Sequence, residues 1–229
     1  MSHIQTSPAT PPQMTQHAML VIWGLFAHRI GLVEAVEAVN LKQKKRDHTP
    51  QTKVLEFLVA ILGGLTHLQD ISRSAHPLDQ DQLVAEAWGQ DAWADYSGVS
   101  RTLTQLTAEE VTDLAAALDS ISQPFIDREV ALALDQAGEI VYDADLTGRP
   151  VSSTSSSYPN TAFGHMGDTI ELGYQAALVS MHSPTYGRLW LSNELHPGDT
   201  VSMTCTQDLV LAAEKRTGRQ PLRRVELLA

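Results

Sequence analysis

The hydrophobic pattern of this chain changes abruptly near residue 137, and this change limits the possible folds more than any other feature. From residue 16 to about residue 135, apolar residues recur at helical spacing. From residue 139 onward, short alternating runs rich in β-branched and aromatic residues are separated by turn-forming residues. Helices and strands segregated in this way favour an α+β fold, with an all-helical N-terminal domain followed by a β-containing domain.

The expected domain boundaries follow from the same change. Residues 1–15 are mostly polar and proline-rich, and they lack the charged start and apolar core of a signal peptide, so we expect a disordered leader. Residues 16–136 are expected to form the helical domain, and residues 137–229 the β-containing domain. The first helix is expected to run from about residue 16 to residue 39.

Helix starts are indicated by capping residues. Thr49, followed by Pro50 at the first helical position, predicts a helix that ends at the glycine pair 63–64. A further helix is expected to end before Gly138. The other expected N-caps are Asp79, Ser97 and, with Glu110 at capping-box spacing, Thr107.

Three strands are expected after residue 138, in the runs EIVYDADLT, GYQAALVSM and GRLWLSNEL. The segment PVSSTSSSYPNTAFGH, residues 150–165, is polar and serine-rich and is expected to be a loop. TCTQDLVLAAEKRTG predicts a helix, and the terminal RRVELLA resembles the start of a fourth strand.

The formal net charge of −11 argues against a surface that is basic all over. Contact with nucleic acid would therefore need a local basic patch. Two patches exist, KQKKR at residues 42–46 and the four C-terminal arginines Arg216, Arg219, Arg223 and Arg224. Either patch is equally well explained as a solvated helix end or loop.

Cysteine content and hydropathy indicate the compartment. Cys205 is the only cysteine, so an internal disulfide is impossible and a reducing cytoplasm is the expected location. The longest apolar run, Met19 to Ala27, is too short to cross a bilayer, so we expect no membrane partner.

Two carboxylates stand in the first β-type segment, EIVYDADLTGRP. Because strand side chains alternate, Asp143, Asp145 and Thr147 share one face, and Ile140, Tyr142, Ala144 and Leu146 share the other, which can be buried. Acids are disfavoured within strands, and paired carboxylates suit Mg²⁺ or Mn²⁺ together with water and phosphate oxygens. The alternative is that both acids merely solvate the end of the strand.

The D-x-D-x-T pattern resembles motif I of the haloacid dehalogenase phosphotransferases. That resemblance implies Asp143 as nucleophile and Asp145 as general acid. The family also uses a downstream lysine and an acidic pair at the end of a later strand. After Asp145 the only lysine is Lys215, within a charged helical end, and no Gly-Asp pair follows an apolar strand.

A second resemblance covers more of the chain. YSGVSRTLTQLTAEEV, DADLTGRPV, the region YPNTAFGH to HPGDT, and RRVELLA occur in the order found in DDE-type insertion-sequence transposases, whose catalytic core is RNase H-like. This resemblance implies Asp145 as the first catalytic acid, because Thr147 follows it by two residues, with Asp143 as second choice. It also implies Mg²⁺ or Mn²⁺, DNA element ends and target DNA as partners, and a homodimer of the complete enzyme.

The family also requires a second acid on a later strand and a glutamate on a later helix. RRVELLA ends where the second acid would be expected to follow, so we interpret the chain as the N-terminal part of a transposase, inactive by itself. The core is then incomplete, with three strands, a helix and the start of a fourth strand.

The helical part contains a candidate DNA-binding element. DQDQLVAEAWG and SGVSRTLTQL have helix-turn-helix proportions, with the second segment as recognition helix. Val99, Leu103 and Leu106 would face the bundle, and the residues facing DNA would be Ser97, Ser100, Arg101 and Thr104. The alternatives are a helical hairpin in which Arg101 pairs with an acid, and a non-enzymatic DNA-binding regulator.

Three tryptophans are expected to anchor hydrophobic cores rather than to stack on bases. They are Trp88, Trp93 and Trp190.

Overall fold

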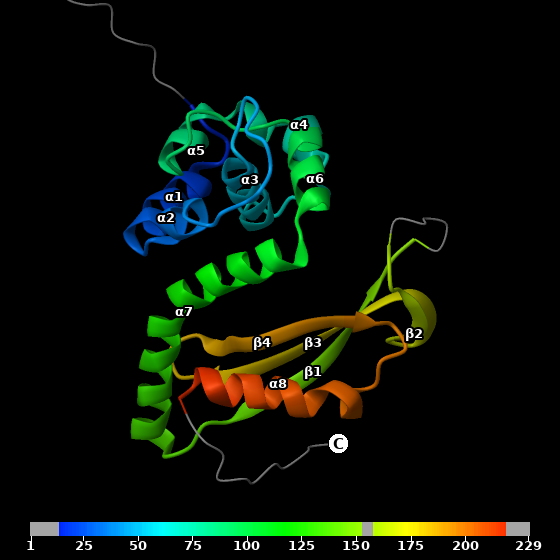
Figure 1. Ribbon diagram of the computed structural model, residues 1–229. Helices are drawn as coiled ribbons and strands as arrows, with labels where there is room; N and C mark the ends of the chain where they lie inside the picture. Colours follow the sequence, from blue (N-terminus) through cyan, green and yellow to red (C-terminus); the bar gives the residue numbers. More distant parts are fainter. Residues whose placement is uncertain (1–13, 153–157, 219–229) are drawn as a thin grey trace, which may run out of the picture. The chain divides into compact units, whose positions relative to one another are not determined.

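The computed structural model describes residues 14–152 and 158–218, which combine helices with a four-stranded antiparallel sheet (Figure 1). The chain divides into two compact units, Met1–Ile121 and Ser122–Ala229. Within the described residues no strand precedes Tyr142, so helices and strands are segregated as expected. The division falls inside a helix, upstream of the boundary expected after residue 136.

The first unit is helical throughout its described residues. Its elements are α1 (Ala18–Arg29), α2 (Leu32–Glu37), α3 (Pro50–Leu62), α4 (Asp70–Arg73), the 3-10 helix η1 (Leu78–Gln80), α5 (Gln82–Ala87), α6 (Tyr96–Gln105) and the first part of α7 (Ala108–Ala137). The single helix expected over residues 16–39 is instead two helices. Gly31 separates them with a φ of 76°, a left-handed conformation that glycine adopts without steric cost.

Helix α3 supplies the centre of the first core. Leu55 and Val59 of α3 are fully buried and pack in the same cluster as Trp88 and Trp93. The indole nitrogen of Trp88 donates a hydrogen bond of 2.9 Å to the carbonyl of Leu20. The expectation that Trp88 and Trp93 anchor a core is therefore confirmed.

Two of the expected helix caps are confirmed. The Thr49 hydroxyl accepts a hydrogen bond from the Thr52 amide at the start of α3. At the start of α7, the Glu110 carboxylate accepts from the Thr107 amide at 2.8 Å, and the Thr107 hydroxyl accepts from the Glu110 amide at 3.2 Å. This reciprocal pair is the capping box that the sequence predicts.

The other two expected caps are wrong by two residues each. Asp81, not Asp79, caps α5, because residue 79 lies inside η1. Asp95, not Ser97, caps α6, and Ser97 lies within the first turn of the helix. Both regions offer competing capping side chains two positions apart, so local sequence does not choose between them.

Helix α7 is one continuous element of 30 residues where two helices were expected. Pro124 lies within it and removes one backbone donor, a few residues after the division between the units. The helix ends before Gly138, as expected, and Gly138 has a φ of 74°.

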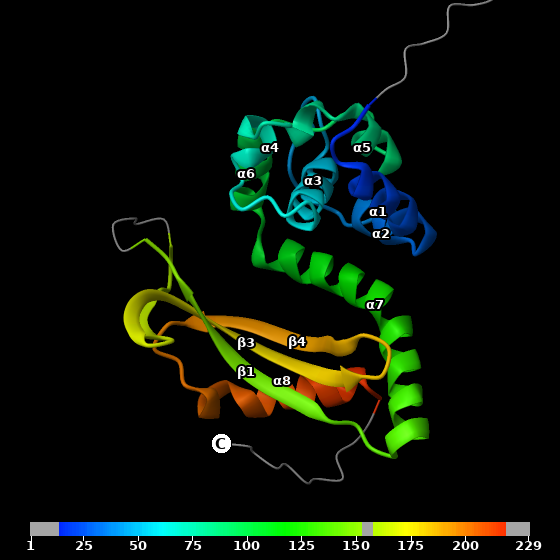
Figure 2. The same cartoon turned by 180° about the vertical axis from the view of Figure 1, so that it is seen from behind.

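The second unit contains an antiparallel sheet built around a long central strand. Its elements are β1 (Tyr142–Pro150), β2 (Ala162–Met166), β3 (Thr169–Ser183), β4 (Gly187–Pro197) and α8 (Ser202–Arg216). Strand β3 pairs with β1 along one edge and with β2 and β4 along the other. Figure 2 shows the sheet from the side opposite α8.

The three expected strands and the expected helix are present, but β2 lies in the segment expected to be a loop. It is five residues long and pairs with β3 through a turn at Gly167, whose φ is 73°. The alternation of apolar and polar residues in β2 is weak, because the strand includes a glycine and a histidine. Its extended conformation therefore depends on pairing with β3. The terminal RRVELLA lies outside the described residues.

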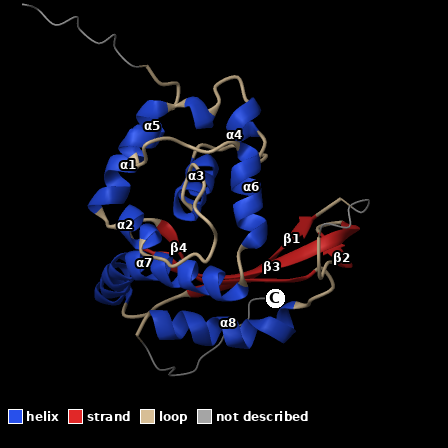
Figure 3. Cartoon of the chain, turned by 45° about the horizontal axis from the view of Figure 1, so that its top comes forward, coloured by secondary structure: helices blue, strands red, loops and turns tan. Residues whose placement is uncertain are grey.

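The core of the second unit lies between one face of the sheet and two helices. Helix α8 crosses this face (Figure 3), and the second part of α7 also contributes to the core. Its most buried members are Ile126, Ala177, Val179, Met181, Leu191 and Ala213. We refer to the opposite face of the sheet as the outer face.

Candidate functional site

The two acids of β1 lie on the outer face, as alternation predicts. Tyr142 and Leu146 pack against the core, whereas Asp145 is exposed. Asp143 lies opposite Ser180 of β3, and Asp145 lies opposite Leu178. Both acids stand in the first half of β1, and the strand continues beyond them to Pro150.

Asp143 is held by a histidine and an arginine from neighbouring strands. Its Oδ2 lies 2.8 Å from His182 Nε2 of β3 and 3.0 Å from Arg188 Nη2 of β4. His182 and Arg188 are directly paired across the β3–β4 ladder. Asp143, which the sequence places on the same face as Asp145, is therefore already bound by neighbouring side chains.

Asp145 differs from Asp143 in having no hydrogen bond or ion pair among the described residues. A single carboxylate is a sufficient protein ligand for Mg²⁺ when water and phosphate oxygens complete the octahedron. Asp145 fits that role. In the described part of the chain, no three acidic, histidine or cysteine side chains gather into a complete metal site.

The outer face also carries exposed apolar side chains. Trp190 is 56% exposed and Leu195 is 62% exposed. The expectation that Trp190 anchors a core is wrong. Trp190 pairs with Ser180 on the outer face, and a register shift between Val179 and Ser180 leaves the adjacent Leu191 in the core instead.

Helix α6 presents its predicted polar residues on one side. Arg101 and Thr104 are exposed, and Ser97 and Ser100 are half-buried. Val99 is fully buried, as predicted. Leu103 packs against the same core, so the orientation of the helix about its own axis agrees with the sequence pattern.

Arg101 is connected to an acid through a serine. Its Nη1 donates to Ser97 Oγ at 3.2 Å, and Ser97 Oγ donates to both oxygens of Asp95 at 3.0 Å. The backbone amide of Gly98 is the main cause that lowers the pKa of Asp95, and Ser97 and Arg101 add to the effect. Arg101 is thus oriented by an acid without a direct ion pair, and its guanidinium stays accessible.

The helix-turn-helix arrangement expected for residues 79–106 is not what the structure contains. Helix α5 has only six residues and packs on α1, whereas α6 packs on α3 and α4. The two helices therefore do not form a tightly packed recognition pair. The residues on α6 remain a candidate surface, but their support comes from α3 and α4.

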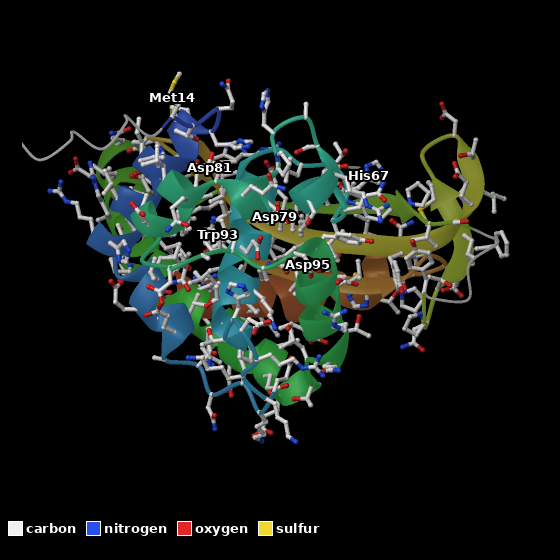
Figure 4. The ribbon with its side chains drawn as sticks, turned by 90° about the horizontal axis from the view of Figure 1, so that it is seen from above. Met14, His67, Asp79, Asp81, Trp93 and Asp95 are labelled. Atoms are coloured by element: carbon white, nitrogen blue, oxygen red, sulfur yellow. The ribbon has the colours of Figure 1, made fainter. Side chains whose placement is uncertain are left out.

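A shallow cavity of about 310 Å³ lies in the first unit, between the segment that starts at Met14 and residues 75–83. Figure 4 labels Met14 and Asp81 at this position. Its polar groups are internally satisfied, because Thr15 Oγ1 donates to Asp81 and the His17 ring bonds the His76 carbonyl. These contacts attach residues 15–17 to the segment of η1 and α5.

Sequence reasoning missed two buried glutamates, one in each unit. Glu56 of α3 is fully buried, and its Oε2 accepts a 2.9 Å hydrogen bond from the Ala94 amide. Its Oε1 has no partner among the described residues, and the same holds for Asp79 Oδ1 and Trp93 Nε1. Burial is the main cause that raises the pKa of Glu56 to about 8, with smaller contributions from Asp79 and Asp95 and an opposing one from the Ala94 hydrogen bond.

Glu129 of α7 is also fully buried, and its Oε1 likewise has no hydrogen-bond partner among the described residues, but its Oε2 has two donors. Its Oε2 accepts from the Ser183 hydroxyl at 2.7 Å and from the Thr185 amide at 3.0 Å. Burial opposes ionisation, yet these hydrogen bonds outweigh it and lower the pKa of the carboxyl. Glu129 thereby fastens the β3–β4 turn to α7. For Glu56 and Glu129 alike, the only sequence signal of burial was a glutamate among the apolar residues of a helix.

No protein-family model, curated protein or solved structure matches this chain. Among the described helices, none has both the length and the apolar character required to cross a membrane.

Proposed function

We propose that this protein takes part in DNA transposition, as a protein of the DDE transposase type. The helical unit binds element ends, and the second unit contributes the first strands of an RNase H-like core. The order of elements supports this proposal, because an acid-bearing strand is followed by two long antiparallel strands and then by a helix that covers one face of the sheet.

The observation that carries the proposal is the contrast between the two acids of β1. Asp143 is held by His182 and Arg188, whereas Asp145 is exposed and unpaired among the described residues. Of the two acids of β1, Asp145 is therefore the one that we assign to metal binding. At such a site Mg²⁺ or Mn²⁺ supplies activation of water or of a 3′-hydroxyl and stabilisation of the leaving oxygen in phosphodiester cleavage.

The role of the chain's own residues is to position and to bind. Asp145 holds one ligand position on a rigid strand of the sheet. Arg101 is the side chain on α6 that is able to make a bidentate contact to guanine or phosphate. A complete catalytic site needs two further acidic side chains beyond those that the described residues bring to the outer face.

The metal proposal is tested by titrating the ¹⁵N-labelled protein with substoichiometric Mn²⁺, whose paramagnetism broadens nearby amide signals even at weak affinity. We expect selective broadening of Asp145 and of Leu178, which lies opposite it on β3. Asp145→Asn should abolish the effect, and the matched variant Asp143→Asn should retain it. Equal broadening in wild type and Asp145→Asn would contradict the assignment.

The phosphotransferase alternative needs Asp143 as a free nucleophile. The hydrogen bond from His182 and the ion pair with Arg188 engage Asp143 and weigh against that role. Hydrolysis of a phosphate monoester by the wild type, lost in Asp143→Asn, would favour this alternative over transposition. Sequence-specific binding of DNA with no metal effect at Asp145 would favour a non-enzymatic regulator.

A further inference from the structure

The segment between α2 and α3 carries the strongest local concentration of positive charge in the described chain. We call residues 42–46, KQKKR, the basic loop. We propose that the basic loop forms one DNA-binding surface with α6 and that Lys44, Lys45 and Arg46 bind the phosphate backbone of a duplex. This inference rests on the proposed function, since it names a further part of the DNA contact.

The basic loop is fixed in place at its start. Leu41, just before it, is buried. The Lys42 amide donates to Glu110 Oε1 at 2.6 Å, and the Lys42 ammonium lies 2.9 Å from Glu109 Oε2. The same Glu110 completes the capping box of α7, so the loop is attached to a helix start and not left to move independently.

A second contact brings the loop to α6. Gln43 Nε2 donates a 3.0 Å hydrogen bond to the Thr102 carbonyl of α6. Thr102 lies between Arg101 and Thr104, the two exposed members of the predicted DNA-facing set. Residues separated by about 60 positions in the chain are thus joined into one surface, which the sequence alone does not reveal.

Three cations at the tip of the loop have no protein partner. Lys44, Lys45 and Arg46 are exposed, and no hydrogen bond or ion pair engages them among the described residues. This contrasts with Lys42, which is neutralised by Glu109. Asp47 is the one acid directly beside them in sequence. Exposed cations without protein partners, on a loop that is attached at its start, are suited to bind a polyanion by charge complementarity.

A DNA duplex fits this surface for a physical reason. Phosphate contacts position a protein on DNA, and side chains in the groove read the bases. The loop would supply the first kind of contact and Arg101 the second. Because the chain as a whole carries a net charge of −11, attraction to DNA must come from such a local patch.

The test compares full-length wild type with Lys44→Gln/Lys45→Gln/Arg46→Gln, measuring fluorescence anisotropy of a labelled random-sequence DNA duplex over a series of salt concentrations. We expect the log–log salt slope to fall by about 2 to 3, because each lost phosphate contact removes about 0.9. The control removes the same charge from exposed positions outside the loop, as Arg29→Gln/Arg128→Gln/Lys215→Gln, and should leave the slope nearly unchanged. Circular dichroism confirms that every variant is folded.

The outcomes distinguish a failure of the loop assignment from a failure of the proposed DNA-binding function. If the wild type binds and the loop variant shows an unchanged slope while Arg101→Ala is impaired, the loop assignment fails and the DNA-binding function stands. If the wild type does not bind the duplex at all, both fail. If poly-glutamate competes as effectively as DNA, the loop recognises negative charge in general and the DNA assignment is overturned.

A second variant tests the connection to α6. Gln43→Ala removes the hydrogen bond to Thr102 but retains all three cations. We expect weaker binding at an almost unchanged salt slope, since the same phosphates are contacted by a less ordered loop. Binding equal to wild type would show that the Gln43 contact does not organise the surface.

Discussion

The helical unit and the sheet unit each bury one glutamate, and the two carboxyl groups behave in opposite ways. Each carboxyl has one oxygen without a hydrogen-bond partner among the described residues, but Glu56 has a single backbone donor on its other oxygen, and its pKa is raised to about 8. Glu129 has a hydroxyl and an amide donor on one oxygen, and its pKa is lowered. The comparison teaches that the donors supplied by distant segments decide the charge of a buried acid, and burial by itself does not.

The largest expected effect is a loss of stability of the helical unit with rising pH. The unfolded chain releases the Glu56 proton near the ordinary pKa of 4.5, whereas the folded unit keeps it until about pH 8. Between these pH values the folded state binds more protons, so the free energy of unfolding falls as pH rises, by up to about 5 kcal/mol. Above pH 8 the contribution is constant.

Urea unfolding followed by tryptophan fluorescence measures this effect, because Trp88 and Trp93 report on the helical core. Glu56→Gln should flatten the profile between pH 5 and pH 8 and stabilise the unit at pH 8. An unchanged profile in Glu56→Gln would refute the raised pKa. Asp91→Asn, at an exposed acid of the same unit, is the control.

Removing the second buried acid should destabilise the sheet unit by about 3 kcal/mol, because Glu129→Ala leaves the Ser183 hydroxyl and the Thr185 amide without their acceptor. The expected readout is faster hydrogen exchange in β3 and β4, measured by mass spectrometry. In the wild type this contribution is present above pH 4.5 and is lost as pH falls through the lowered pKa of Glu129. Glu129→Gln, which keeps an acceptor oxygen, should cost less than Glu129→Ala.

A smaller effect is expected from the helix starts, which also differ between the units. Thr49 caps α3 with its hydroxyl, whereas Val201 at the start of α8 offers no side-chain cap. Val201→Asp should therefore stabilise the sheet unit by about 1 kcal/mol, and Thr49→Ala should destabilise the helical unit by a similar amount. Thermal melts of both variants and of Val201→Ala, as a control for removing the apolar side chain, check this expectation.

The smallest effect on stability is expected from substituting Trp190, which the sequence wrongly predicted to be a core residue. Trp190 is 56% exposed, so Trp190→Ala should change the free energy of unfolding by no more than about 0.5 kcal/mol. Trp88 is fully buried, and Trp88→Ala should cost about 4 kcal/mol. Comparable losses from the two substitutions, measured in urea, would show that the outer face is covered in solution.

Several features were predictable because they depend on neighbours a few positions apart. The cap at Thr49, the capping box of Thr107 and Glu110, and the two faces of β1 follow from local spacing. The segregation of helices from strands follows from hydrophobic period alone. The shifted caps at Asp81 and Asp95 mark the limit of this reasoning, because neighbouring side chains compete for one helix start.

The sequence by itself determined that helices precede strands, and it placed both acids on one face of β1. Only the tertiary structure decided that Asp143 is engaged by His182 and Arg188 while Asp145 is free, and that Gln43 joins the basic loop to α6. The reason is physical. Secondary structure arises from interactions within a few residues, whereas the charge and accessibility of a side chain depend on donors and cations that folding brings from distant parts of the chain.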